Sequence, residues 1–209
     1  MNNYVYIRTG LPDLTPDWKE NSRKLEDYLL EIRELCSKKD NEIIDLIEDG
    51  FDKEKIGLEF YKKATSHKIA FIREYFTFDL FVRNAKVRYL NNELKREPEK
   101  DVISLLDSDE VDLTETFDFD EAEKLQAILE GKDILARERA IDDLYWDKID
   151  QITVFHYLDF ESILGVIVKI KIIERWLKLD EKTGREMFRK LVDEVRGTFK
   201  GVEYNSESK

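Results

Sequence analysis

The feature that most constrains the fold of this chain is its scarcity of residues that interrupt helices. The 209 residues include only 8 Gly and 3 Pro, about half of the roughly 12% that these two residues contribute to an average protein. The three prolines, Pro12, Pro16 and Pro98, leave two long windows without a proline, 17–97 and 99–209. Because proline breaks an α-helix and glycine weakens one, these windows favour a mostly helical protein.

Apolar residues recur at helical spacing through most of both windows. One or two long helices are expected between Lys53 and about Glu97, with Pro98 as the stop. The aromatic run that begins at Tyr75 is too wide for one face, which indicates a helix with neighbours on several sides. The other expected helices cover residues 122–130, 133–146 and 160–177, and a last one begins at Asp180 or Thr183 and ends near Gly197.

Residues that favour helix ends mark where these helices begin and stop. Ser and Asp side chains accept hydrogen bonds from the free backbone N–H groups of a first turn. The predicted N-caps are Ser22, Asp40, Asp52 and Asp159. Gly50 is expected at the C′ position, just past the end of a helix, where glycine is common.

Two segments have the alternating pattern of a strand. Tyr4–Ile7 alternates weakly and is predicted to be extended, although a short strand there has no partner strand nearby. Val166–Ile173 is rich in β-branched residues, but its apolar residues keep the helical period from Phe160 to Leu177, so a helix is predicted. The predicted fold class is therefore all-α, with at most a short extended segment at the N-terminus.

Negative charge is concentrated in one segment of the chain. Residues 99–123 hold 11 acids and one base, and so contribute −10 of the formal net charge of −12. The other 184 residues form a nearly neutral body with a net charge of −2. We expect a helical region over 1–98, an acidic loop or insert over 99–123, a helical region over 124–200 and a frayed tail over 201–209, together forming one compact domain.

This charge argues against nucleic acid and anionic membranes as partners, because both attract cationic surfaces. The argument is weaker for the nearly neutral body, which has room for local basic faces. A block of like charges is most often a solvated loop, and less often a docking surface for a basic partner. The acids that we single out for such a surface are Asp107, Asp109, Glu110 and Asp112.

We find no pattern for a catalytic, cofactor or metal site. The Gly131-Lys132 pair lacks the rest of a phosphate-binding loop, and an EF-hand counted from Asp107 has Asp112 where glycine is required. His67 and His156 fit no metal or phosphohydrolase spacing, so structural or surface roles are favoured. The single cysteine, Cys36, excludes an intramolecular disulfide and suggests a reducing, cytoplasmic compartment.

Several blocks of the sequence resemble one known family. They are Tyr4–Leu14, Phe78–Leu90, Ala136–Trp146, Phe155–Tyr157 and Ile172–Asp180. They resemble a bacterial family of unassigned function whose members look like the C-type central-stalk subunit, also called the d-type subunit, of V/A-type ATPases.

This resemblance implies an all-helical, elongated or funnel-like protein without catalytic residues. It implies a position at the inner membrane, where such a protein caps the proteolipid rotor ring and connects it to the rotating shaft subunits. Contact with the membrane would then be indirect, through the ring. The transported ion, H⁺ or Na⁺, is not implied.

Four polar residues lie within otherwise apolar helices: Arg83, Asn84, Glu174 and Arg175. Burying such groups is costly unless they are paired. We expect them to be paired or hydrogen-bonded, with pairing between helices of this chain favoured over contact with a partner subunit. The main alternative to an ATPase subunit is a helical adaptor that binds basic partners through residues 99–123, and a helical enzyme that uses paired carboxylates remains a third reading.

Overall fold

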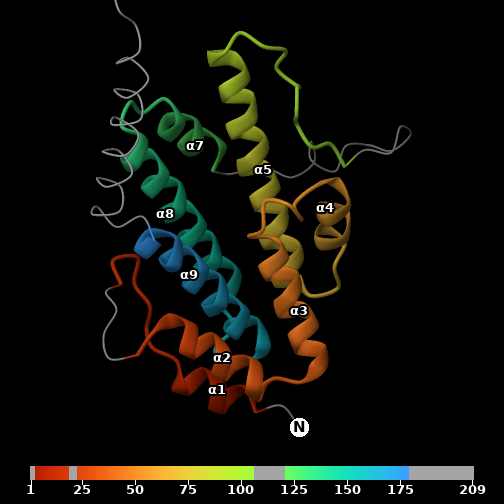
Figure 1. The fold of residues 1–209 in the computed structure, drawn as a ribbon, viewed down its shortest axis with the longest axis vertical. Coiled ribbons are helices and arrows are strands. Elements are labelled where there is room, and N and C mark those ends of the chain that lie inside the picture. The colour runs from red at the N-terminus through yellow and green to blue at the C-terminus, as the bar shows by residue number, and fades with distance from the viewer. Residues whose placement is uncertain (1–2, 19–22, 106–120, 179–209) are drawn as a thin grey trace, which may run out of the picture. The chain divides into compact units, whose positions relative to one another are not determined.

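The computed structural model describes residues 3–18, 23–105 and 121–178, and within these ranges it contains helices and no strand. The predicted all-α fold class is confirmed. The chain divides into two compact units, Met1–Lys171 and Ile172–Lys209. Figure 1 shows the helices α1 (Tyr4–Gly10), α2 (Leu25–Leu35), α3 (Lys38–Asp49), α4 (Leu58–Thr65), α5 (Ala70–Glu93), α7 (Ala122–Leu129), α8 (Ile134–Thr153) and α9 (Phe160–Lys178).

Helix α5 is the centre of the first unit. It packs against α4, α7 and α8 (Figure 1). Its buried side chains include Phe71, Phe76 and Phe78, and burying each phenylalanine stabilises the fold by about 1.5–3 kcal/mol. The width of the aromatic run predicted neighbours on several sides, and this prediction is confirmed.

The opening residues form the short helix α1, so the predicted extended segment is wrong. Asn3 caps the helix, because its side-chain oxygen accepts a hydrogen bond from the backbone N–H of Tyr6 at 3.1 Å. Ile7 is buried, and the Tyr4 ring lies 5.4 Å from the ring of Phe160. A helix this short is not stable alone. Contacts with the rest of the unit therefore decide its conformation, which local alternation could not reveal.

Helix α3 begins after Ser37, so the prediction of Asp40 as its N-cap is wrong. The Ser37 hydroxyl accepts a hydrogen bond from the Asp40 N–H at 3.2 Å, and the Asp40 carboxylate accepts one from the Ser37 N–H at 3.0 Å. This reciprocal pair is a capping box. Asp40 is thus the third residue of the first turn, and its carboxylate is buried there.

Gly50 is the C-cap of α3 rather than the predicted C′ residue, and its φ of −67° lies in the right-handed region. Space, not backbone conformation, requires glycine here. A Cβ at this position would lie 2.4 Å from Cε1 of Phe76, whose ring packs edge-on against Phe60 with 4.9 Å between the centroids. The glycine therefore lets an α5 aromatic ring approach the end of α3.

The segment from Lys53 to Glu97 contains two helices, α4 and α5. One or two helices were predicted there, so the second arrangement is the one observed. Asp52 does not cap the first of them. Its carboxylate accepts a hydrogen bond from the N–H of Glu54 at 3.0 Å in a turn, and α4 begins only after Gly57. The predicted N-cap Ser22 lies outside the described residues.

Helices α7, α8 and α9 begin at or within one residue of their predicted starts. Asp133 caps α8, which continues past its expected end at 146 as far as Thr153. Asp159 caps α9 by accepting a hydrogen bond from the N–H of Ser162 at 3.0 Å. The β-branched stretch 166–173 is helical, as its period predicted.

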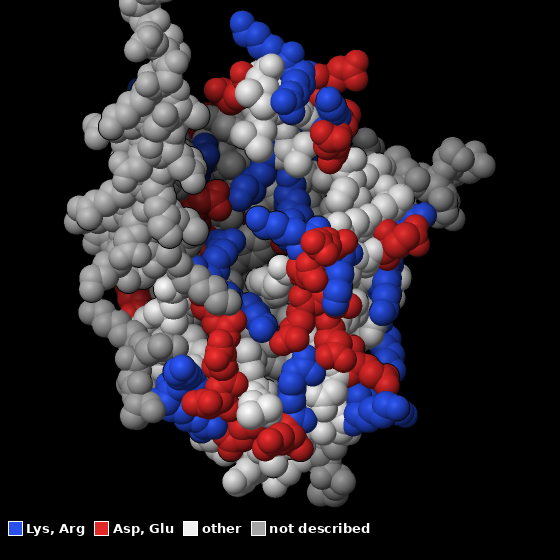
Figure 2. All heavy atoms as spheres, viewed as in Figure 1, with Lys and Arg blue, Asp and Glu red and all other residues white. Residues whose placement is uncertain are grey.

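The acidic segment is described only at its ends. Residues 106–120 lie outside the described residues, as do the predicted helix that ends near Gly197 and the tail 201–209. On the face of the molecule in Figure 2, basic and acidic side chains are interspersed rather than separated by sign. Among the described residues, no helix combines the length and the apolar character needed to cross a membrane.

Candidate functional site

The most exposed apolar side chains of the described chain lie in the loop between α8 and α9. We call residues 154–158 the apolar loop. Phe155 has 84% of its surface exposed and Tyr157 has 72%, and Val154 and Leu158 are also exposed. Single exposed apolar residues are ordinary, but a contiguous group of them marks a surface that binds something.

Hydrogen bonds fix the apolar loop to the helices that flank it. Nδ1 of His156 lies 2.6 Å from the carboxylate of Asp159, the N-cap of α9. The other ring nitrogen lies 3.7 Å from Glu161. Glu161 also accepts a hydrogen bond from the N–H of Phe71, at the start of α5, at 3.0 Å. His156 of the loop is therefore held by Asp159 and Glu161, and Glu161 in turn connects α9 to the start of α5.

His156 favours its charged form in this setting. The hydrogen bond to Asp159 raises the pKa of His156 above its ordinary value of 6.5, and the charges of Asp159 and Glu161 act in the same direction. A raised folded-state pKa contributes stability below pH 6.5, and this contribution is lost as the pH rises through the folded-state pKa. The structural role expected for this histidine agrees with these contacts.

Helix α1 lies beside the apolar loop. Its Arg8 lines a pocket of 240 Å³ together with Val154, His156 and Tyr157, and with residues of α8 and α9 that include Lys169. The ring contact between α1 and the first residue of α9 holds the helix in this place. The apolar loop and one face of α1 thus form a continuous surface.

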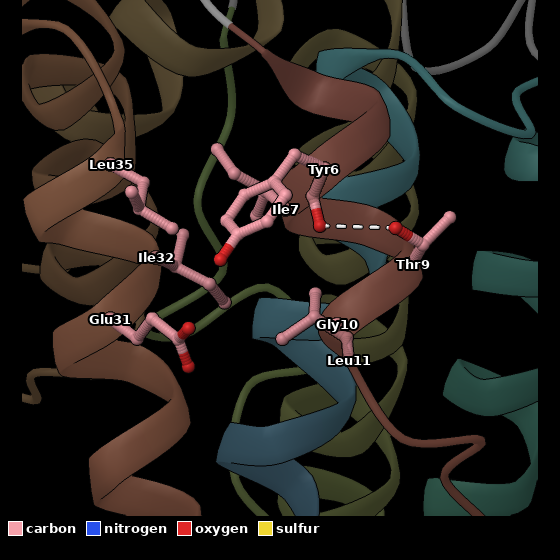
Figure 3. A pocket seen from close by; sticks show the side chains of 8 residues that line it. All are labelled: Tyr6, Ile7, Thr9, Gly10, Leu11, Glu31, Ile32 and Leu35. Carbon is pink, nitrogen blue, oxygen red and sulfur yellow. Dashed lines mark hydrogen bonds between the residues drawn. The ribbon is translucent and has the colours of Figure 1, made fainter.

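A second, smaller pocket of 160 Å³ lies on the other side of α1. Figure 3 shows the Tyr6 ring of α1 directed toward Ile32 of α2, and Thr9 and Leu35 also line this pocket. The Thr9 hydroxyl donates a hydrogen bond to the backbone oxygen of Tyr6 at 3.2 Å (Figure 3). The carboxylate in the lining, that of Glu31, is paired with Arg23. This pocket therefore offers an apolar contact surface rather than reactive groups.

A buried polar network lies in the core of the first unit, around Asp79 of α5. This carboxylate is 6% exposed. One of its oxygens accepts hydrogen bonds from the Tyr61 hydroxyl at 2.5 Å and from Nε of Arg83 at 2.8 Å. The other oxygen accepts one from the Tyr145 hydroxyl at 2.7 Å. The network joins α4, α5 and α8 through one charged group.

The groups of this network are matched to one another rather than left available for chemistry. Burial, followed by the charge of Asp79, raises the pKa values of Tyr61 and Tyr145 above the ordinary value of 10, so both hydroxyls stay protonated as donors. Sequence reasoning named Arg83 but missed Asp79. Their spacing of four residues on one helix was the signal that pointed to the pair.

The structure places the first two predicted candidates, Arg83 and Asn84, next to each other on α5. Arg83 is paired with Asp79, so pairing within the chain, as expected, accounts for it. The side chain of Asn84 is buried and binds both backbone groups of Ile103: its amide donates to the oxygen at 2.8 Å, and its oxygen accepts from the N–H at 3.0 Å. Asn84 therefore anchors the start of the acidic segment to α5.

We expect Asn84→Ala to destabilise the protein by about 1–3 kcal/mol, because it leaves two partly buried backbone groups of Ile103 without partners. Urea unfolding followed by circular dichroism measures this change, and faster hydrogen exchange at the Ile103 amide should accompany it. Asn92→Ala is the matched control, since Asn92 is exposed on the same helix. Equal stability of the two variants would contradict the anchoring role.

The remaining predicted candidates do not join this group. Glu174 and Arg175 lie near the end of α9, and both take part in interactions there. The four acids singled out for a docking surface, Asp107, Asp109, Glu110 and Asp112, lie outside the described residues. The adaptor reading that depends on them stays a prediction.

The other potentially reactive side chains have structural surroundings. Burial raises the pKa of the Cys36 thiol to about 11, which keeps it protonated and unreactive at neutral pH. Burial lowers the pKa of His67, whose Nδ1 accepts a hydrogen bond from the N–H of Ile69 at 3.2 Å. No group of three or more potential metal ligands occurs within the part of the chain that the structure describes.

A family model described as a protein of unknown function (DUF2764) matches residues 52–198. The match includes the Asp79 network and the apolar loop but not α1, α2 or α3. The comparisons found no curated protein and no solved structure that matches the chain.

Proposed function

Because the chain belongs to the DUF2764 family, whose function is unknown, we propose a function from the resemblance of its sequence blocks and from the contacts of its own residues: it is a non-catalytic subunit of a bacterial V/A-type ATPase. In this proposal it acts like the C-type central-stalk subunit. It links the rotating central shaft to the proteolipid rotor ring at the inner membrane, and so couples rotation to the movement of ions.

The observation that carries this proposal is the exposed apolar loop on a well-packed helical body. Aromatic residues such as Phe155 and Tyr157 are enriched in the buried centres of protein interfaces. His156, between these two rings, is held by its contact with the Asp159 carboxylate and by its backbone hydrogen bond to Thr153, which lowers the cost of ordering the loop backbone on binding. A fixed aromatic surface of this kind suits a protein that docks permanently on others.

The interior of the first unit supports the same role. A protein that transmits torque requires helices that do not slide past one another. Asp79 joins α4, α5 and α8 through side-chain hydrogen bonds, and close packing resists deformation of such a core. Two of the sequence blocks that resemble the ATPase-related family, 78–90 and 155–157, contain Asp79 and two of the exposed aromatic residues.

Affinity purification from the native host tests the proposal. The chain is tagged at its chromosomal locus, and membranes are extracted with a mild detergent. We expect the tag to recover the ATPase shaft subunits and the rotor ring in near-stoichiometric amounts. Recovery of neither, while the ATPase assembled in the same cells lacks the chain, would refute the proposal.

Matched variants connect this test to the apolar loop. The double substitution Phe155→Ser and Tyr157→Ser should reduce recovery strongly without lowering stability, because both side chains are exposed. Leu94→Ser removes an exposed apolar side chain at the end of α5 and should leave recovery unchanged. Neutralising Asp107, Asp109, Glu110 and Asp112 should also leave recovery unchanged, whereas the adaptor alternative predicts that binding is lost.

A further inference from the structure

The pocket beside the apolar loop contains a cation that lacks a counter-charge among the described residues. Arg8 lines this pocket, and within that part of the chain its guanidinium has no ion pair or side-chain hydrogen bond. A half-buried arginine in such a place has lost part of its hydration without gaining an acceptor. An anion from another molecule would restore the missing interaction.

The other charged groups of the pocket already have partners. Lys169 is paired with Asp150 at 2.5 Å, and its ammonium lies 4.6 Å from the centre of the Trp146 ring. His156 is paired with Asp159. Among the described lining residues, the charge that remains unmatched is that of Arg8, so the pocket is electrostatically suited to a single negative group.

The shape and the rim of the pocket indicate the size of that group. A volume of 240 Å³ admits a side chain but not a folded element, and Val154 and Tyr157 contribute apolar walls. Ser162 adds a short polar side chain to the lining. Outside the pocket the exposed ring of Phe155 extends the apolar surface. An acidic side chain flanked by apolar residues fits both the charge and the rim.

We infer that this pocket is a subsite for an aspartate or glutamate side chain of the partner protein that covers the apolar loop. The carboxylate pairs with the Arg8 guanidinium, which can bind it through two parallel hydrogen bonds. The neighbouring apolar residues of the partner pack on Phe155 and Tyr157. This inference adds detail to the proposed function. It rests on the proposed function in one respect only, which is that a protein partner binds at the apolar loop.

A protein is favoured over an anionic lipid as the source of the negative group. Recognition of anionic lipids typically uses clusters of about four to eight Lys or Arg residues, whereas Arg8 is the unmatched cation among the described residues that line this pocket. Interfaces between proteins, in contrast, combine arginine with aromatic residues at their centres, which is the combination found here.

The test uses the tagged full chain and the proteins that the unmodified chain recovers. Arg8→Glu places two carboxylates together and should reduce that recovery about tenfold or more, whereas Arg8→Lys keeps the charge and should stay within about threefold. Thermal unfolding should be unchanged in both variants. Recovery of the same proteins by Arg8→Glu at the level of the unmodified chain would overturn the inference.

Cross-linking then identifies the group that Arg8 contacts. A carbodiimide condenses an amine with a carboxylate only when the two touch, with loss of water. In the Arg8→Lys variant, we expect the new amine to form an amide with an acidic residue of the recovered protein. The same amine at Leu94, introduced by Leu94→Lys, should form none. Absence of the cross-link at position 8 would overturn the inference.

The outcomes separate this inference from the proposed function. If recovery depends on Arg8 but the recovered proteins are not ATPase subunits, the subsite stands and the proposed function fails. If ATPase subunits are recovered regardless of Arg8, the proposed function stands and the subsite fails. If the unmodified chain recovers no protein, both fail. Binding to phosphatidylglycerol vesicles that depends on Arg8 would reassign the pocket to lipid and overturn the inference.

Discussion

Replacing Asp79 with alanine should destabilise the protein by about 3–5 kcal/mol, among the largest effects expected of a single substitution here. The carboxylate accepts hydrogen bonds from Tyr61, Arg83 and Tyr145. Its removal leaves two buried hydroxyl groups and a guanidinium without their acceptor. Chemical unfolding in urea, followed by the helical circular dichroism signal, measures the loss.

Asp147→Ala is the control for Asp79→Ala. Asp147 lies on α8 and is paired with Lys124, but both side chains are about 60% exposed. Solvent screens such a pair, so its loss should change stability by no more than about 1 kcal/mol. If both aspartate variants were equally stable, the Asp79 network could not be the structural centre that we describe.

Replacing Phe76 with alanine should cost about 3–5 kcal/mol, because a large ring is removed from a closely packed core. Phe76 is 1% exposed. Its ring packs edge-on against Phe60 and Tyr75 and lies against Gly50 at the end of α3. The substitution therefore weakens contacts among α3, α4 and α5 together. Thermal and urea unfolding should both show the loss.

Phe155→Ala makes the same chemical change at an exposed site. Because most of the Phe155 ring is already in contact with solvent, its removal should leave stability within about 0.5 kcal/mol of the unmodified protein. A large loss at Phe155 together with a small loss at Phe76 would reverse the assignment of core and surface.

The helical spacing of apolar residues predicted the helices whose buried faces can be recognised from their own sequence. The stretch 166–173 looks like a strand for a few residues, but the apolar period extends from 160 to 177, and the segment is helical. The aromatic run of α5 similarly indicated burial on several sides. Both signals extend over several turns, so local exceptions did not change the outcome.

Elements that depend on distant contacts could not be predicted in the same way. The conformation of α1 depends on Phe160, which lies far along the chain. The role of Gly50 depends on a ring of α5. Neither contact leaves a periodic trace in the local sequence, and for this reason the expected extended segment and the C′ assignment were both wrong.

The candidate site was predicted only in part. Arg83 and Asn84 were found because polar residues within apolar helices require partners. The apolar loop was not singled out, because the residue types of Phe155 and Tyr157 usually indicate a core position. Their position between two predicted helices was the one local signal that they face outward. The place of Arg8 in the pocket is visible only once α1 is placed beside that loop.

Electron cryo-microscopy of the ATPase, purified through a tag on one of its shaft proteins, tests the central claim most directly. If the chain links shaft and ring, density between them should accommodate the first unit, including the 24-residue helix α5, with the apolar loop in contact with a neighbouring protein. A complete shaft and ring joined without this density, from cells that contain the chain at its native level, would contradict the claim.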